Sequence, residues 1–216
     1  MAITTYSELQ TALSNFSGRS GLTSRLPEFI MLAEQRIKNG SEANGQVVPP
    51  LRTRAMLSAS DLATVAGTET VALPTGFLEI NERLYISGND RKVLDSLTYA
   101  QLRLNYSSTS SGEPCAFSVL GSNLVFAPTP DAIYTIPMSY YALTPLSVSQ
   151  TTNAVLTNHP DVYLQAALVE LFLYAKATER LAVAFDAYAS SVKSANGATQ
   201  AAIFSNATRM RSRVSV

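Results

Sequence analysis

Residues 112–175 read GEPCAFSVLGSNLVFAPTPDAIYTIPMSYYALTPLSVSQTTNAVLTNHPDVYLQAALVELFLYA, a run of strand-forming residues that leads directly into an apolar helix. Between residues 98 and 160 the only formal charges are Arg103, Glu113 and Asp131, and the helix that follows carries Glu170 alone. Domains usually place charges on their solvated faces, because the burial of an unpaired ion is costly. We therefore expect this surface to be covered by further copies of the chain in an assembly.

The composition is that of a folded protein with a low share of charge. The chain has 216 residues, of which 46% are hydrophobic and 15% charged, against about 25% charged in an average protein. The longest apolar stretch, residues 162–175, is shorter than the roughly 20 residues that cross a bilayer. The first 20 residues lack the pattern of a signal peptide. We expect a protein that is made in the cytoplasm and has no membrane partner.

The single cysteine and the single histidine limit the chemistry of the chain. Cys115 alone cannot form an internal disulfide, and one Cys with one His supplies no cluster of metal ligands. His159 precedes Pro160 at a predicted helix start, where we expect a capping or surface residue rather than a general base. The sequence therefore predicts no catalytic residue, no cofactor and no metal.

Basic and acidic residues balance over the whole chain but not at its C-terminus. Sixteen of each give no net charge, so nucleic-acid binding has no electrostatic support. After Asp186 no acidic side chain follows, whereas the last residues hold Arg209, Arg211 and Arg213. We expect a short basic tail over residues 206–216, with the three arginines on one side when it is extended.

The first 40 residues predict two amphipathic helices. Thr5 and Glu8 have the spacing of a capping box, and an apolar stripe follows that ends near Gly18. A second helix is expected over about residues 23–39, with Pro27 in its first turn. The two predicted buried stripes are Leu9, Leu13 and Phe16 in the first helix, and Leu26, Ile30, Ala33 and Ile37 in the second.

A linker and a strand-rich region follow. Residues 41–50 have the Gly and Pro content of a linker. Gly121-Ser122 has the composition of a two-residue hairpin turn, and residues 98–104 predict a short helical piece. The predicted strands are Thr68–Leu73, Leu84–Ile86, Cys115–Leu120, Asn123–Phe126 and Ala132–Tyr141.

The last third of the chain predicts two helices. The first begins at Pro160, runs to about Lys176 and is apolar nearly all round, which is typical of a helix that is central or covered by a neighbour. The second begins near Glu179, and Gly197 is expected to bend or end it. Its stripe suits packing along another helix and consists of Leu181, Phe185, Tyr188, Val192, Ala195, Thr199 and Ala202.

These elements predict an α+β protein, a helical bundle of about four helices with a central β-rich insert. We expect residues 1–50 and 151–205 to form the helical body, residues 51–150 the β-rich insert, and residues 206–216 the basic tail.

Three segments, in this order and spacing, resemble the head-to-tail adaptor (connector) proteins of tailed bacteriophages, especially short-tailed ones. They are Leu73–Glu79 (LPTGFLE), Gly112–Tyr141 with its Gly-Ser-Asn turn, and Asn153–Tyr163 (NAVLTNHPDVY). The alanine-rich helix pair behind them completes the match, which covers most of residues 73–196. The chain departs from the pattern in having no tryptophan; Phe185 stands in the last helix where we expect an aromatic such as Trp.

The resemblance implies a structural virion protein of the neck between head and tail. Such adaptors form a ring, usually of twelve copies, that docks under the portal protein, holds a nozzle or tail tube protein on its other side and lets double-stranded DNA pass without sequence-specific contact. The C-terminal segment of the family often extends into clefts of the portal. The resemblance thus implies portal binding by Ile203, Phe204, Arg209, Arg211 and Arg213. For packing between copies through the helical body, we expect Leu168, Phe172, Phe185, Tyr188 and Val192.

Two alternatives stay open. The same composition fits a tail stopper or nozzle component that lies further down the tail. A cell-wall hydrolase would use Glu79 and Glu82 as a carboxylate pair, but such a pair must face a sugar across a cleft. Two glutamates three residues apart beside Arg83 are more typical of a solvated turn. A non-enzymatic adaptor is the preferred interpretation.

Overall fold

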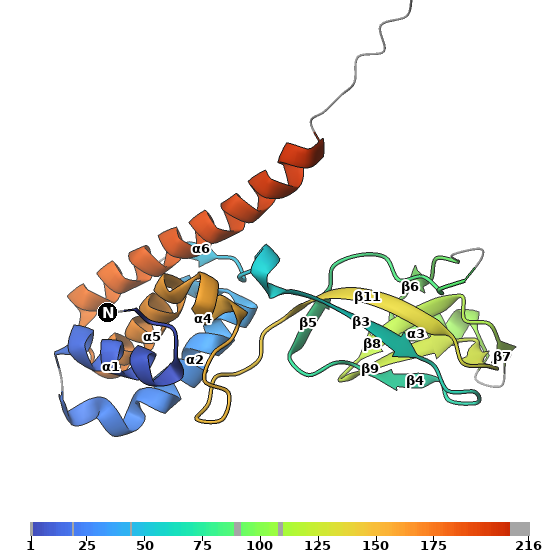
Figure 1. Ribbon diagram of the computed structural model, residues 1–216, viewed down its shortest axis with the longest axis horizontal. Coiled ribbons are helices and arrows are strands. Elements are labelled where there is room, and N and C mark those ends of the chain that lie inside the picture. Colours follow the sequence, from blue (N-terminus) through green and yellow to red (C-terminus); the bar gives the residue numbers. More distant parts are fainter. Residues whose placement is uncertain (1, 19, 44, 89–91, 108–109, 208–216) are drawn as a thin grey trace, which may run out of the picture. The chain divides into compact units, whose positions relative to one another are not determined.

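The computed structural model describes residues 2–18, 20–43, 45–88, 92–107 and 110–207. The chain divides into two compact units. Met1–Met56 and Leu143–Val216 form one, which we call the helical unit, and Leu57–Ala142 form the other, which we call the β unit. Figure 1 shows the elements of both.

Helix α1 (Tyr6–Ser17) begins with the capping box that the sequence predicts. The Thr5 hydroxyl accepts a hydrogen bond from the Glu8 N–H, and Glu8 Oε2 accepts one from the Thr5 N–H at 3.0 Å. The helix ends at Gly18, whose φ of 64° lies in the left-handed region that favours glycine. Leu9 and Leu13 are buried as predicted, but Phe16 is exposed. The prediction for Phe16 is wrong because it lies in the last turn of α1, at the surface of the unit.

Helix α2 (Leu26–Asn39) follows a 3-10 helix, η1 (Ser20–Arg25), so it begins later than predicted. Pro27 lies in its first turn, and the whole predicted stripe is buried. Residues 41–50 are not a plain linker. They contain a hairpin of β1 (Ser41–Ala43) and β2 (Gln46–Val48), and the 3-10 helix η2 (Arg54–Met56) follows.

Three helices complete the helical unit: α4 (Ala154–Asn158), α5 (Pro160–Tyr174) and α6 (Thr178–Ala207). α5 contacts α1, α2, α4 and α6 and lies among them in Figure 1. Most of its apolar surface is therefore covered within the unit itself, and only Leu173 and Tyr174 at its C-terminal end are large apolar residues left exposed. α6 has 30 residues, which correspond to a length of about 45 Å. Gly197 does not end this helix, since α6 continues to Ala207, and the predicted bend at Gly197 stays a prediction.

The β unit contains two main sheets. In the first, β3 (Leu57–Ala63) and β5 (Phe77–Ile80) flank the long β11 (Thr135–Ala142), with antiparallel pairing. The second has the order β4 (Thr70–Ala72), β9 (Asn123–Ala127), β8 (Ala116–Leu120) and β6 (Asp95–Ser96). The remaining elements of this unit are α3 (Tyr99–Asn105) and the paired short strands β7 (Ser111–Gly112) and β10 (Thr129–Pro130).

The β8–β9 hairpin confirms the predicted two-residue turn. Leu120 pairs with Asn123, which leaves Gly121 and Ser122 in the turn, and Gly121 has a φ of 60°. Side chains from both sheets form one core, including Leu62, Phe117, Phe126, Ile136 and Met138, and Leu84 from the segment after β5 joins it. The predicted strand Leu84–Ile86 is absent from the described part of the chain, where Tyr85 makes only an isolated bridge to Val93.

The predicted fold class needs a correction. The described residues form six α-helices and eleven strands in four sheets, with 45% helix and 25% strand, so the protein is mixed α+β and not clearly a four-helix bundle. Two local features raise the helix number. α3 belongs to the β unit and begins with a capping box of Thr98 and Gln101. α4 is separate from α5 because Pro160 has no backbone N–H and so cannot donate the hydrogen bond that would continue α4.

Candidate assembly surfaces

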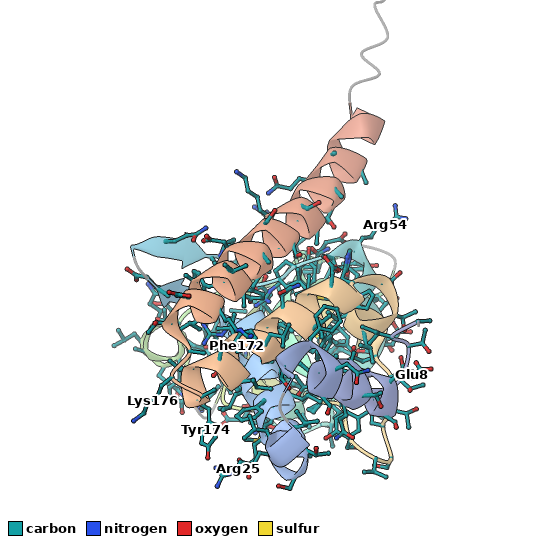
Figure 2. All side chains as sticks on the ribbon, turned by 90° about the vertical axis from the view of Figure 1, so that its left-hand side faces the viewer. Glu8, Arg25, Arg54, Phe172, Tyr174 and Lys176 are labelled. Atoms are coloured by element: carbon teal, nitrogen blue, oxygen red, sulfur yellow. The ribbon has the colours of Figure 1, made fainter. Side chains whose placement is uncertain are left out.

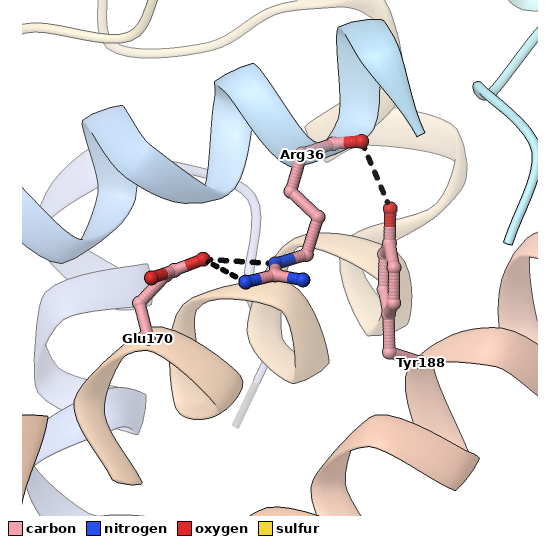
Figure 3. Close-up of polar contacts among 3 residues, drawn as sticks. All are labelled: Arg36, Glu170 and Tyr188. Carbon is pink, nitrogen blue, oxygen red and sulfur yellow. Dashed lines mark hydrogen bonds and ion pairs between the residues drawn. The ribbon is translucent and has the colours of Figure 1, made fainter. Parts of the chain in front are cut away.

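An ion pair and a hydrogen bond, which share Arg36, join three helices of the helical unit (Figure 3). Arg36 of α2 donates from Nε to Glu170 Oε1 of α5 at 2.8 Å, and its Nη2 contacts the same oxygen. The side chains of Arg36 and Glu170 are only 16% and 11% exposed. Tyr188 of α6 donates from its hydroxyl to the Arg36 carbonyl at 3.3 Å, and burial raises its pKa. These contacts fix α2, α5 and α6 against one another.

A second polar network is centred on Glu34, which is 3% exposed. Its Oε1 accepts hydrogen bonds from the Leu146 N–H at 2.7 Å and from the Tyr163 hydroxyl at 3.1 Å. Asn153 donates to the Tyr163 oxygen and to the Thr144 carbonyl. Burial raises the pKa of the Glu34 carboxyl, and the hydrogen bonds from Leu146 and Tyr163 oppose that shift. The network holds the segment 143–153 against α2 and α5.

An apolar groove lies where α1, α5 and α6 meet. It has a volume of about 410 Å³, and its apolar lining includes Leu168, Phe172 and Ala184. Phe16 and Val183 line it as well and are 62% and 71% exposed. The polar lining consists of Gln165, Glu179 and Arg180. Concave apolar surfaces with exposed large side chains are typical of sites that bind another protein.

Further apolar side chains are exposed near the C-terminal end of α5. Leu173 and Tyr174 are both about half exposed. The Tyr174 ring packs against Phe29, with 5.6 Å between ring centroids, and Arg25 lies over it at 4.9 Å. Figure 2 shows Phe172, Tyr174 and Arg25 on the same side of the helical unit. This face is the best candidate in the helical unit for a contact with another protein.

The five residues predicted to pack between copies are buried within their own chain. Leu168 and Phe172 line the apolar groove, so a neighbour seated there would touch them. Phe185, Tyr188 and Val192 are buried on α6. Contact of these residues with another copy stays a prediction. Sequence reasoning missed Phe16 and Val183 as residues of the groove. Val183 lies outside the periodic apolar stripe of its helix, so the sequence pattern did not mark it as a contact residue.

The residues predicted to bind a portal lie mostly beyond the described part of the chain. Arg209, Arg211 and Arg213 are outside the described residues. Ile203 and Phe204 belong to α6, but their side chains are also outside the description. Their role in portal binding stays a prediction.

The residues considered for catalysis are dispersed. Glu79 lies in β5, while Glu82 follows that strand and lines a pocket with Arg83 and Asp95. His159 caps α5 without a side-chain capping hydrogen bond, and Cys115 is half-buried. No group of three or more possible metal ligands occurs among the described residues, and no helix in that part of the chain is long and apolar enough to span a bilayer.

Comparison with known proteins identifies one family. A model of the family described as SU10 adaptor protein matches residues 4–213, which is nearly the whole chain. No curated protein matches the sequence.

Proposed function

This chain belongs to the SU10 adaptor protein family, and from that premise we propose that it forms the ring that joins the portal to the tail. Membership makes it a structural adaptor protein of a bacteriophage. The match spans both the helical unit and the β unit, so the proposal concerns the full chain. In this proposal the copies, usually twelve, surround a channel in the virion neck. Double-stranded DNA passes through the channel without sequence-specific contact, and a nozzle or tail tube protein binds on the other side.

The apolar groove supports contact between copies. Ring interfaces are heterologous, so each copy presents one face to each of its two neighbours. The groove offers a concave apolar surface for one of these faces, with Leu168 and Phe172 inside it and Phe16 and Val183 exposed beside it. Burial of these side chains by a neighbour would remove apolar surface from water, which is favourable at about 25 cal/mol per Å².

The substitution Val183→Asp is expected to prevent assembly without unfolding the chain. Val183 is exposed, so its replacement changes the free energy of unfolding by only about 0.5 kcal/mol, whereas a carboxylate in an apolar interface is strongly unfavourable. Ala182→Asp adds the same charge at an exposed neighbouring position that does not line the groove. Ring formation on the portal, counted by electron microscopy, should fail for Val183→Asp only. Equal rings for both variants would exclude the groove as the contact between copies.

The C-terminal segment is the proposed contact with the portal. Ile203 and Phe204 supply apolar side chains and Arg209, Arg211 and Arg213 supply charge, and arginines form strong bidentate hydrogen bonds with carboxylates. A chain that ends after Ser205 removes the three arginines and leaves the apolar pair in place. Changing Ile203 and Phe204 to alanine in the full-length chain tests the apolar pair separately.

Cryo-electron microscopy of the chain with its cognate portal ring tests the proposal. We expect the full-length chain to dock as a closed ring and the chain that ends after Ser205 to fail. If both dock equally, the adaptor role holds and the role of the arginines is excluded. If the full-length chain does not bind the portal, the adaptor proposal is wrong, and a stopper or nozzle component further down the tail becomes the preferred function.

A further inference from the structure

A second apolar surface of the helical unit lies where α2 packs against the C-terminal end of α5. It consists of Leu32 of α2 with Leu173 and Tyr174 of α5, and each of these side chains is about half exposed. Tyr174 packs against Phe29 of α2, and the ion pair of Figure 3 joins the same two helices. Leu32 lies between these two contacts on α2, and Leu173 lies between them on α5. We call the three exposed residues the α2–α5 patch.

The patch and the apolar groove lie on different sides of α5. Phe172 lines the groove, whereas Tyr174 belongs to the patch. The two residues are two positions apart, so at 3.6 residues per turn their side chains leave the helix in directions about 160° apart. Figure 2 shows both at the same end of the helical unit, with Tyr174 beside Arg25. One chain therefore carries a groove and a separate set of exposed apolar side chains.

Each of the two surfaces has one exposed acid and one exposed arginine at its edge. Glu179 and Arg180 line the groove. Arg25 lies over the aromatic ring of the patch, and Glu28 lies one turn before the patch on α2. The ion pairs among the described residues include neither Glu28 nor Glu179. When the patch of one chain enters the groove of another, Arg25 can pair with Glu179 and Arg180 with Glu28.

We propose that the α2–α5 patch of one copy packs into the apolar groove of the next copy. The proposal rests on the ring function and names the second face that contact through the groove requires. A heterologous interface needs two different, complementary surfaces on one chain. The apolar character that patch and groove share, together with the charges at their edges, selects a second copy as the occupant. Because the two surfaces leave α5 on different sides, each copy uses both at once, and the contact repeats around the ring.

Two variants, each blocked on one surface, test the proposal. Leu173→Asp places a carboxylate on the patch, and Val183→Asp places one in the groove. With either variant alone, every contact between copies contains a blocked surface. In a mixture, the intact patch of the Val183→Asp chain enters the intact groove of the Leu173→Asp chain. The mixture therefore forms pairs with one copy of each variant, which a misfolded chain could not form.

Native mass spectrometry of portal complexes at substoichiometric adaptor gives the readout, and heavy nitrogen in one variant distinguishes the two. Contacts between copies make the filling of a portal cooperative, so the wild-type chain should give mostly full and empty portals. Each variant alone should bind without cooperativity. The mixture should give about ten times more mixed pairs than independent binding predicts, which corresponds to about 1.4 kcal/mol.

Leu104→Asp is the matched control, because it makes the same change at an exposed leucine of α3, in the β unit and outside both surfaces. This control should fill portals as cooperatively as the wild type. Wild-type cooperativity of Leu173→Asp overturns the inference. A mixture without an excess of mixed pairs also overturns it, since the patch would then contact something other than the groove. Failure of the wild-type chain to bind the portal would instead reject the proposed function.

Discussion

Replacement of Glu34 by alanine is expected to lower the free energy of unfolding by about 3 kcal/mol. Glu34 accepts the Leu146 N–H and the Tyr163 hydroxyl, and both donors lie in the interior of the helical unit. Alanine removes the only acceptor that the described residues give to each of them and leaves a small cavity. Each buried donor that is left without an acceptor costs about 1 to 3 kcal/mol. Part of this cost is offset, because the alanine variant no longer has to bury a carboxyl group.

Glu34→Gln is the matched variant, because both hydrogen bonds go to one oxygen that glutamine retains. We expect it to unfold within about 1 kcal/mol of the wild-type chain. Urea denaturation followed by circular dichroism measures the free energy of unfolding of the wild type, Glu34→Ala and Glu34→Gln. The three proteins are compared only if this free energy has the same dependence on urea concentration in each. If Glu34→Ala and Glu34→Gln were equally stable, the two hydrogen bonds would contribute nothing, and the segment 143–153 would be held by packing alone.

The same pair of variants gives a pH signature. Burial raises the pKa of Glu34 in the folded chain above its ordinary value of 4.5. The folded state therefore retains this proton where the unfolded state has released it. The stability that this proton contributes is complete below pH 4.5 and is lost as the pH rises through the higher folded pKa. The stability of the wild type relative to Glu34→Gln should fall over that interval and then level off. Carboxyl groups that both proteins share contribute equally and cancel in this stability difference. A stability difference that stays flat or rises with pH would contradict the raised pKa of Glu34.

Local signals in the sequence predicted several elements well. The capping boxes and glycine turns depend on neighbouring residues, so Thr5 with Glu8 and Gly121-Ser122 could be read directly. The strand β3 was missed because its sequence, LSASDLA, has too few apolar residues to show alternation. It is held by pairing with β11, which lies more than 70 residues away in the chain. Long-range pairing of this kind leaves no local pattern.

The candidate surfaces were harder to predict than the helices that carry them. Glu34 lies one turn after Ile30 and beside Ala33, at a position of the buried stripe of α2, and this spacing was a usable signal. The partners of Glu34, in contrast, come from residues more than 100 positions later. The excess of acidic residues in the β unit, eight Asp and Glu against four Lys and Arg, became visible only with the boundary of that unit, because the neutral total hides it.

Substitution of Arg36 by methionine is expected to cost about 2 to 4 kcal/mol, whereas the double variant Arg36→Met/Glu170→Met should lie within about 1 kcal/mol of wild type. The single change leaves the Glu170 carboxylate, 11% exposed, without its partner on α2. The double change replaces a largely buried ion pair by apolar side chains of similar length, which removes the cost of desolvating both charges. A double-mutant cycle from chemical denaturation measures the coupling.

The ion pair also bears on assembly, because Glu170 lies on α5, two residues from Phe172 in the apolar groove. An apolar pair restores stability but supplies no fixed hydrogen-bond geometry between α2 and α5. If the salt bridge sets the position of α5, the double variant should be stable and yet fill the portal less cooperatively than wild type. Tyr188→Phe keeps the ion pair, loses only the hydrogen bond to the Arg36 carbonyl, and is the control. Full cooperativity in the double variant would show that packing alone positions the groove.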